Sequence, residues 1–291
     1  MANIELIKAL RERTGAGIMD CKNALTACND DLDRATDWLR EKGIAKAAKK
    51  ADRIAAEGLS TVAVCQKCGK GAIVEINCET DFVAKSDPFK ELVKKCAEVV
   101  LEKQPKSLDE VKELTKELFT EATLKLGEKL DFRRFDVLSK VAPTNGLSSY
   151  IHMGGTHSVL VLLEKEDEEL GQGIAMHICA NAPKYIVESD VSKEWIENET
   201  KIQREAAKND PKLQNKPEQA LERIIQGKVH KQYAEITLVD QQYLLDGDKT
   251  VGQVLQEKGN KVLKFVHYTV GEGLEKRHDD FAEEVKKQAN L

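Results

Sequence analysis

An acidic and an aromatic side chain stand side by side in the segment Glu79–Ser86, which reads Glu-Thr-Asp-Phe-Val-Ala-Lys-Ser. The apolar run Ala72–Cys78, typical of a strand, precedes this segment, and the helix-start signal Ser86–Phe89 follows it. Asp81 and Phe82 are therefore expected at the tip of a strand-to-helix turn, a place where a rigid scaffold often carries function. Such a pair can present a charge and an apolar ring to a partner molecule.

A purely structural interpretation of the same turn also fits the residues. Thr80 and Asp81 would accept hydrogen bonds from nearby backbone donors, and Phe82 would fold into the core. Residue types alone favour this interpretation, so the functional one needs further support.

The sequence lacks the motifs of several enzyme classes. Gly69-Lys70-Gly71 and Gly227-Lys228-Val229 both lack the Ser or Thr that completes a phosphate-binding loop. Neither His-Glu-x-x-His nor Gly-x-Ser-x-Gly occurs, and the six histidines are scattered. We expect no covalent catalysis, no cofactor and no metal site.

Cys65 and Cys68 have the Cys-x-x-Cys spacing of half a structural zinc site. A complete site needs four ligands, and Cys78 lies roughly 20 Å away along the returning strand at ~3.3 Å per residue. The sequence contains no second Cys-x-x-Cys. A thiol-bearing turn without metal is the favoured interpretation, and zinc binding is the alternative.

Composition places the chain among globular proteins of more than one compact unit. It has 291 residues, 33% of them charged, and a net charge of −5. No apolar run approaches the ~18 residues that span a bilayer, and the N-terminus lacks the layout of a signal peptide, so a cytoplasmic location without membrane contact is expected. The acidic balance and 5% aromatic content argue against nucleic-acid binding. The lysines near residues 42–53 are expected on a solvated helix face.

The seven cysteines are expected as reduced thiols, because no secretion signal precedes them. Three of them fall in apolar helical patterns and are expected as small core residues: Cys21, Cys28 and Cys96.

Apolar spacing predicts three short helices within residues 3–43, broken at Gly15 and Gly17 and ended at Gly43. About forty residues make only a small core, which is typical of a helical docking module similar to a ubiquitin-associated fold. A helical, alanine-rich connector is expected up to about Glu57.

The remaining pattern predicts two related α+β halves, each a small antiparallel sheet covered by helices. In the first half, strands at 59–64 and 72–76 precede the Thr80 turn and helices over 86–100 and 111–126. In the second half, strands at 148–153 and 159–163 precede a helix over 168–182. Strands at 234–239 and 262–270, with a helix over 250–258 between them, would complete this half.

Residues 189–232 differ from both halves, since narrow apolar stripes border many charges. The first stripe is expected to include Val191, Trp195, Ile202 and Ala206, and the second Leu221, Ile224 and Ile225. This pattern predicts an inserted helical hairpin of coiled-coil type, and a C-terminal helix is expected over 279–288. The expected division is 1–54 for the helical module and connector, 55–144 for the first half, 145–188 with 233–270 for the second half, 189–232 for the hairpin and 271–291 for the C-terminal part.

Two motifs in this order, Thr14–Lys22 (Thr-Gly-Ala-Gly-Ile-Met-Asp-Cys-Lys) and Thr80–Val83 (Thr-Asp-Phe-Val), resemble the bacterial elongation factor Ts family. The resemblance covers nearly the whole chain. The chain departs from the family's familiar pattern at the 65–71 turn, where Cys65 and Cys68 lie. The resemblance implies a guanine nucleotide exchange factor that acts on elongation factor Tu, both GDP-bound and nucleotide-free.

The resemblance also implies roles for individual residues. The element Thr80, Asp81, Phe82 and Val83 would displace the partner's Mg²⁺, with the Phe82 ring as a wedge. Further partner contacts would come from a set in two regions: Lys8, Arg11, Ile18, Met19 and His152. For Ile18 the alternative is core packing, and for His152 a structural role.

Other functions stay open from the sequence. A non-catalytic adaptor or chaperone would bind its clients through the N-terminal module and the hairpin. A zinc-stabilised or RNA-binding protein is suggested only by the cysteine pair and the 42–53 lysines. The hairpin is expected to mediate either a homodimer or a partner contact.

Overall fold

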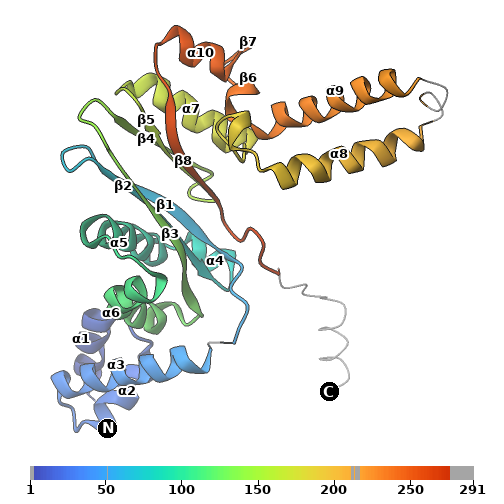
Figure 1. The fold of residues 1–291 in the computed structure, drawn as a ribbon. Coiled ribbons are helices and arrows are strands. Elements are labelled where there is room, and N and C mark those ends of the chain that lie inside the picture. Colours follow the sequence, from blue (N-terminus) through green and yellow to red (C-terminus); the bar gives the residue numbers. More distant parts are fainter. Residues whose placement is uncertain (1–2, 51, 211–212, 214–216, 276–291) are drawn as a thin grey trace. The chain divides into compact units, whose positions relative to one another are not determined.

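The computed structural model describes residues 3–50, 52–210, 213 and 217–275 (Figure 1). Backbone contacts divide the chain into two compact units. Unit 1 comprises Met1–Val137, Ile151–Ser158 and Tyr268–Leu291, and unit 2 comprises Leu138–Tyr150 and Val159–His267. The five-part division expected from the sequence stays a prediction, and the helix expected over 279–288 lies outside the described residues.

Unit 1 begins with the three predicted helices, α1 (Ile4–Thr14), α2 (Ile18–Ala27) and α3 (Leu32–Lys49). Asn3 caps α1, since its side chain accepts a 3.0 Å hydrogen bond from the Glu5 N–H. Gly15 ends the helix in the left-handed conformation, with φ of 66°. The small shared core includes buried Leu10, Leu25 and Leu39, together with the predicted Cys21 and Cys28.

The expected helix stop at Gly43 is wrong, because α3 continues to Lys49. Gly43 is buried, and a Cβ atom there would lie 2.7 Å from Cγ of Leu124. The glycine lets α3 approach the helix that carries Leu124. Its role is close packing rather than helix termination.

The first sheet has the order β1-β2-β3, formed by β1 (Glu57–Cys65), β2 (Lys70–Cys78) and β3 (Leu130–Ser139). β1 and β2 pair antiparallel from Glu57↔Cys78 to Cys65↔Lys70. α5 (Asp87–Lys103) packs against β1 and β2, α6 (Leu108–Leu126) packs on α5, and α3 packs on α6 (Figure 1). Alternate residues of β2 face α5 and share a core with buried Phe89, Cys96 and Phe132.

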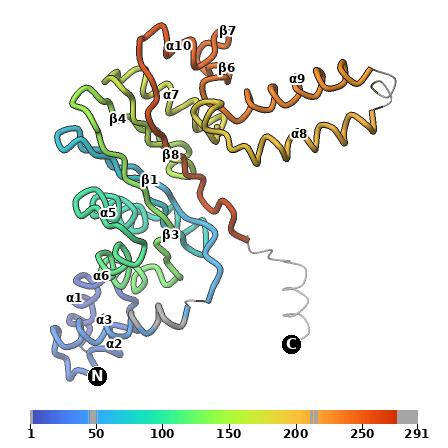
Figure 2. The backbone as a smooth tube through the Cα atoms, viewed as in Figure 1, coloured from blue at the N-terminus to red at the C-terminus, as the bar shows by residue number. Residues whose placement is uncertain are grey.

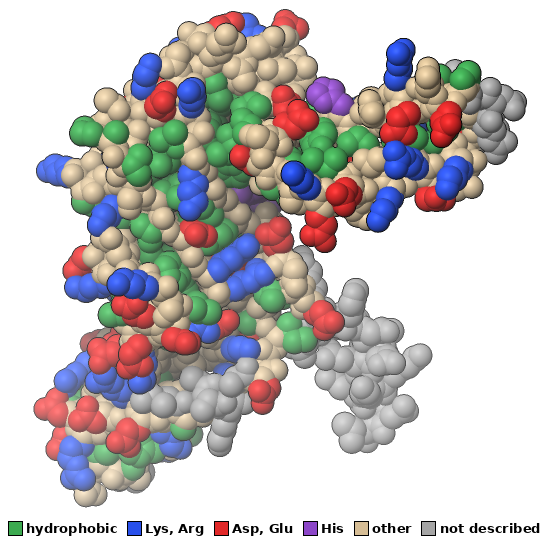
Figure 3. Space-filling view, in the orientation of Figure 1, with side chains coloured by type: hydrophobic (Ala, Val, Ile, Leu, Met, Phe, Trp, Pro, Cys, Tyr) green, Lys and Arg blue, Asp and Glu red, His purple; other side chains and the backbone are tan. Residues whose placement is uncertain are grey.

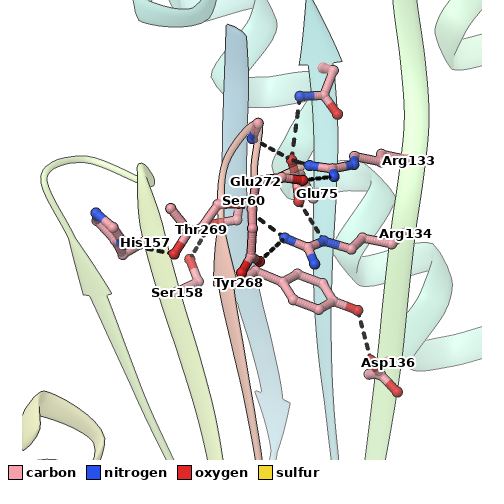
Figure 4. Close-up of polar contacts among 12 residues, drawn as sticks. Ser60, Glu75, Arg133, Arg134, Asp136, His157, Ser158, Tyr268, Thr269 and Glu272 are labelled. Carbon is pink, nitrogen blue, oxygen red and sulfur yellow. Dashed lines mark hydrogen bonds and ion pairs between the residues drawn. The ribbon is translucent and has the colours of Figure 1, made fainter. Parts of the chain in front are cut away.

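Strand β3 was not expected from the sequence, because charged side chains break its apolar pattern. Its residues Asp131, Arg133, Arg134 and Asp136 interrupt the apolar alternation that marks a strand. The structure accounts for two of these charges: Arg133 Nη1 lies 2.7 Å from Oε1 of Glu75, and Arg134 Nε lies 2.6 Å from Oε2 (Figure 4). Glu75 lies on β2 and is fully buried.

The chain from Tyr268 onward binds to the same carboxylate. The Gly271 N–H donates to Oε1 of Glu75 at 2.9 Å. Arg134 also donates to the Thr269 carbonyl at 3.0 Å and lies over the Tyr268 ring, 4.2 Å from its centroid. Tyr268 donates its hydroxyl to Asp136 at 2.8 Å (Figure 4). Burial and the neighbouring Asp136 raise the pKa of Tyr268, so this hydroxyl keeps its proton.

The second sheet has the order β4-β5-β8, formed by β4 (Gly146–His152), β5 (His157–Leu163) and β8 (Val262–Thr269). Most of this sheet belongs to unit 2, and the strand ends 151–152, 157–158 and 268–269 belong to unit 1. α7 (Glu168–Asn181) and α10 (Val251–Glu257) share a core with β5, in agreement with the sequence analysis. The short strands β6 (Gln242–Tyr243) and β7 (Asp246–Thr250) were not expected.

A helical hairpin of α8 (Lys193–Lys208) and α9 (Glu218–Ile236) is inserted within unit 2 (Figures 1 and 2). Trp195 and Tyr233 pack with ring centroids 5.6 Å apart and share a core with buried Ala207, Ile225 and Val229. The expected stripe is wrong at two positions, because Ile202 is 50% exposed and Ala206 is also exposed. Basic and acidic side chains are intermixed along the hairpin face seen in Figure 3.

The strand expected at 234–239 is also wrong. α9 continues to Ile236, and a short 3-10 helix follows at Leu238–Asp240. Tyr233 explains the difference, since packing on Trp195 keeps this β-prone segment helical. The fold is α+β with small sheets, and none of the described helices is long and apolar enough to cross a membrane.

Replacing Glu75 with Ala should lower the free energy of unfolding of unit 1 by about 3 kcal/mol, because two guanidinium groups and the Gly271 N–H lose their buried partner. Hydrogen exchange of the β2 amides measures this loss. Glu272→Gln is the control: Glu272 also pairs with Arg134 but is 62% exposed, so its effect should stay below about 0.5 kcal/mol. Equal effects of both substitutions would contradict the assigned importance of Glu75.

Alanine at two helical glycines should have opposite effects. Gly227→Ala in α9 should stabilise by about 1 kcal/mol, because nothing lies within 4 Å of the added Cβ atom. Gly43→Ala should destabilise by about 1 kcal/mol or more, since the Cβ atom collides with Leu124. Urea unfolding measures both effects. For Gly43→Ala it is followed by Trp38 fluorescence in a Trp195→Phe background. For Gly227→Ala it is followed by Trp195 fluorescence in a Trp38→Phe background. Stabilisation by Gly43→Ala would show that the glycine is not a packing requirement.

Candidate functional site

The Thr80 turn connects β2 to a helix of one turn, α4 (Asp81–Lys85). Thr80 is the N-cap, with extended backbone angles, and its hydroxyl oxygen accepts a 3.3 Å hydrogen bond from the Val83 N–H. The Cys78 thiol donates to the Thr80 carbonyl at 3.2 Å. These local bonds fix the direction in which α4 leaves the sheet.

A carboxylate from a distant part of the chain holds the same turn. Oε2 of Glu128 accepts from the N–H groups of Glu79 and Thr80, both at 3.0 Å, and Oε1 accepts from the Thr80 hydroxyl at 2.6 Å. In return, Oε1 of Glu79 accepts from the Lys129 N–H at 2.6 Å. Arg53 completes the arrangement with a 3.2 Å contact to Glu79. We call Glu79, Thr80, Glu128 and Lys129 the reciprocal clasp.

Phe82 projects from this rigid base into solvent and is 83% exposed. The next two residues point inward: Val83 packs against the first core and Ala84 is buried. The structural interpretation, in which Phe82 fills its own core, is therefore wrong. An aromatic ring this exposed leaves a large apolar surface in water, which is typical of an interaction site.

Asp81 lies beside the ring and pairs with Lys85, with Oδ2 and Nζ 2.6 Å apart. The hydrogen bond from Lys85 lowers the pKa of the Asp81 carboxyl group, which is therefore ionised at neutral pH. Both side chains are at least half exposed. Because water screens such a pair, Asp81 can exchange Lys85 for donors of a partner at low cost.

The N-terminal candidates lie on α1 and α2. Lys8 and Arg11 are exposed and three positions apart, so they share one face of α1. Ile18 and Met19 begin α2 and are 54% and 62% exposed. Core packing of Ile18 is therefore excluded, and two apolar side chains stand in water next to the Gly15–Gly17 loop.

His152 is the last residue of β4 and is exposed. Its ring centroid is 6.2 Å from that of His157. The following turn is fixed to β1, because the Gly155 carbonyl accepts from the Ser60 N–H at 2.7 Å and from its hydroxyl at 3.0 Å. A Cβ atom on Gly155 would lie 2.8 Å from the Ser60 carbonyl oxygen, so this contact requires glycine.

All nine candidate residues belong to unit 1, but they lie in four separate places: on α1, on α2, at the Thr80 turn with α4, and on β4. The structure brings together only the four of the Thr80 turn. The sequence analysis missed Glu128, which determines the conformation of that turn. A usable signal was Gly127, the left-handed cap of α6, because it predicts that Glu128 begins a turn after the helix.

Comparison with known proteins identifies the chain's relatives. The model of the family described as Elongation factor TS matches residues 79–272, a range that includes the Thr80 turn and His152 but not the N-terminal candidates. Two curated proteins named Elongation factor Ts, from Limosilactobacillus reuteri strain DSM 20016 and from L. reuteri subsp. reuteri strain JCM 1112, are each 44% identical over 290 residues. Each alignment covers 98% of this chain and 97% of the relative. The chain thus belongs to the elongation factor Ts family of translation elongation factors.

Proposed function

We propose that this protein is a guanine nucleotide exchange factor that binds elongation factor Tu and promotes the release of GDP. The observation that carries the proposal is the Phe82 ring, 83% exposed on a turn held by the reciprocal clasp. Membership of the elongation factor Ts family supports the choice of partner.

A GTPase holds its nucleotide through backbone donors, a lysine and Mg²⁺. The Phe82 ring would enter the partner's nucleotide domain near the Mg²⁺ site. Asp81 would compete for the donors that organise that site. The exchange factor needs no catalytic base of its own, because it acts by stabilising the open form of the partner.

The size of the effect follows from apolar burial. Moving a phenylalanine side chain from water into a protein interior contributes roughly 2–3 kcal/mol, equal to roughly a 30- to 150-fold change in an equilibrium constant. If the ring is buried only when the nucleotide site is open, this energy weakens GDP binding. Linkage requires that GDP weaken binding of the exchange factor by the same factor.

Because the turn is already rigid, little of the free energy from burying the Phe82 ring is lost to ordering the loop. A loop that had to become ordered on docking would lose part of the gain to conformational entropy. Here Thr80 already has hydrogen bonds at its hydroxyl and its N–H. Further contacts from Lys8, Arg11, Ile18, Met19 and His152 would supply affinity that does not depend on the state of the nucleotide site.

Phe82→Ala and the double variant Asp81→Ala/Phe82→Ala should reduce stimulated GDP release by about 30-fold or more, the scale of an interface hot spot. Release of a fluorescent GDP analogue from purified elongation factor Tu, with and without this protein, measures the effect. Val141→Ala is the matched control, because Val141 is also 83% exposed but lies outside the candidate site. Thermal unfolding should be unchanged in all three variants.

Full stimulation by a folded double variant would refute the wedge. Binding to the partner, measured with and without GDP, tests the alternative of a non-catalytic adaptor, since an adaptor would bind equally well in both conditions. GDP-insensitive binding would therefore refute the proposed function itself.

Glu128→Gln should weaken stimulated release less than Phe82→Ala does. The amide of glutamine has one acceptor oxygen, so it cannot accept both from the Thr80 hydroxyl and, through a second oxygen, from the two N–H groups. The turn then becomes mobile and must be ordered on docking. Titration of stimulated release should show a higher half-saturating concentration with a similar plateau, and hydrogen exchange at Thr80 should become faster. An unchanged half-saturating concentration despite faster exchange would contradict a positioning role for Glu128.

A further inference from the structure

The turn between β1 and β2 carries two thiols in a defined conformation. β1 ends at Cys65, β2 begins at Lys70, and these two residues form the last pair of the hairpin. Cys68 lies within the turn and is exposed, and Cys65 is half-buried. The thiols are free, so both sulfur atoms are available as ligands.

The backbone of this turn is folded around the Cys65 sulfur. The Cys68 N–H donates to Sγ of Cys65 at 3.2 Å, and the Gly69 N–H donates to the Gln66 carbonyl at 3.3 Å. Gly69 has φ of 66°, which returns the chain into β2 and favours glycine. N–H groups aimed at a sulfur atom stabilise a thiolate, which is the form that binds a metal ion.

The positive charges around the turn also favour the thiolate form. Lys67 lies inside the turn, between the two cysteines. The Cys68 thiol lies against Cys65 and donates to the Cys65 carbonyl oxygen at 3.5 Å. Lys70 adds a second cation at the start of β2.

We propose that Cys65 and Cys68 form half of a tetrathiolate Zn²⁺ site, completed by the same two cysteines of a second copy of this chain. Zn²⁺ in structural sites takes four ligands in a tetrahedron, often as two Cys-x-x-Cys pairs. Within the described part of the chain, no third His, Cys, Asp or Glu side chain groups with this pair, so the remaining two ligands come from elsewhere.

A second copy of the chain can provide both the two missing thiolate ligands and positive charge near the metal ion. A Zn²⁺ ion with four thiolates has a net charge of −2, and each copy brings Lys67 and Lys70 to the site. Two identical turns can meet about a twofold axis, which is the commonest symmetry of protein dimers. The assembly therefore supplies both the missing ligands and the compensating charge.

The cysteine turn is far enough from the Thr80 turn that a metal ion there would not obstruct the proposed exchange activity. The turn lies at the opposite end of the β1–β2 hairpin from α4 (Figures 1 and 2). The nine residues of β2 separate them, and the eight steps from Lys70 to Cys78 span roughly 26 Å at ~3.3 Å per residue. A metal-linked pair would present two Thr80 turns far from the metal.

Binding of Zn²⁺ by the four cysteines involves no oxidation or reduction. Four Cys S–H groups lose their protons to solvent, and four Zn–S bonds form. Because protons are released, the apparent affinity for Zn²⁺ should rise as the pH rises.

The test uses the reduced, metal-free, full-length chain, kept in a phosphine reductant that does not bind zinc tightly. Light scattering during titration with Zn²⁺ should show the molar mass doubling, with one metal ion bound per two chains. Co²⁺ as a spectroscopic probe should give intense thiolate-to-cobalt charge-transfer absorption and a tetrahedral d–d spectrum. A chelator should reverse both changes.

Cys65→Ser and Cys68→Ser should each abolish the mass change and the charge-transfer absorption. Cys28→Ala, which removes a buried thiol outside the turn, should leave both intact. Nucleotide release stimulated by the metal-free Cys68→Ser variant should equal that of the unaltered chain. One Zn²⁺ per chain without a change of mass would overturn the proposal. So would the absence of zinc uptake, or a doubling that persists in the Cys65→Ser/Cys68→Ser double variant.

Discussion

A single buried carboxylate organises the sheet of unit 1. Glu75 has no exposed surface, and Arg133, Arg134 and the Gly271 N–H all bind it. A charge removed from water is costly unless it is paired and hydrogen-bonded, so β2, β3 and the segment after β8 must occupy compatible positions at the same time. Through this constraint three distant parts of the sequence form one scaffold, and the end of β2 that carries the Thr80 turn becomes a fixed point.

The turn itself shows how rigidity and exposure are combined. The reciprocal clasp satisfies the backbone donors of Glu79, Thr80 and Lys129 without covering α4. Val83 and Ala84 anchor the helix in the core, so Phe82 projects outward although its neighbours point inward. A large ring in water lowers the solubility of the free protein. That cost is understandable if the ring is covered in the working complex, and the ionised Asp81 beside it keeps the tip hydrated until then.

Local patterns in the sequence predicted the elements whose apolar spacing is regular, such as β2, α5 and α7, and also the turn at Thr80. They failed where a distant residue decides the structure. β3 was missed because its arginines serve Glu75, and α9 was ended too early because Tyr233 packs on Trp195. Gly43 was taken as a helix stop because its contact with Leu124 of α6 is not visible in the sequence. The candidate residues could be named from motif resemblance, but Glu128, which holds the Thr80 turn in place, becomes apparent only in three dimensions.

The bond between Glu75 and Gly271 joins positions 196 residues apart. A ribosome releases the chain from the N-terminus, so β2 emerges long before the residue whose N–H completes the hydrogen bonding of Glu75. Arg133 and Arg134 follow Glu75 after 58 and 59 positions and can form an early, incomplete version of the sheet. Nascent or prematurely terminated chains that lack residue 271 therefore contain all three strands of the first sheet. Their buried Glu75 carboxylate, however, lacks one of its hydrogen-bond donors. We expect such products to open more often than the finished protein and to be cleaved faster by proteases that act on open chains.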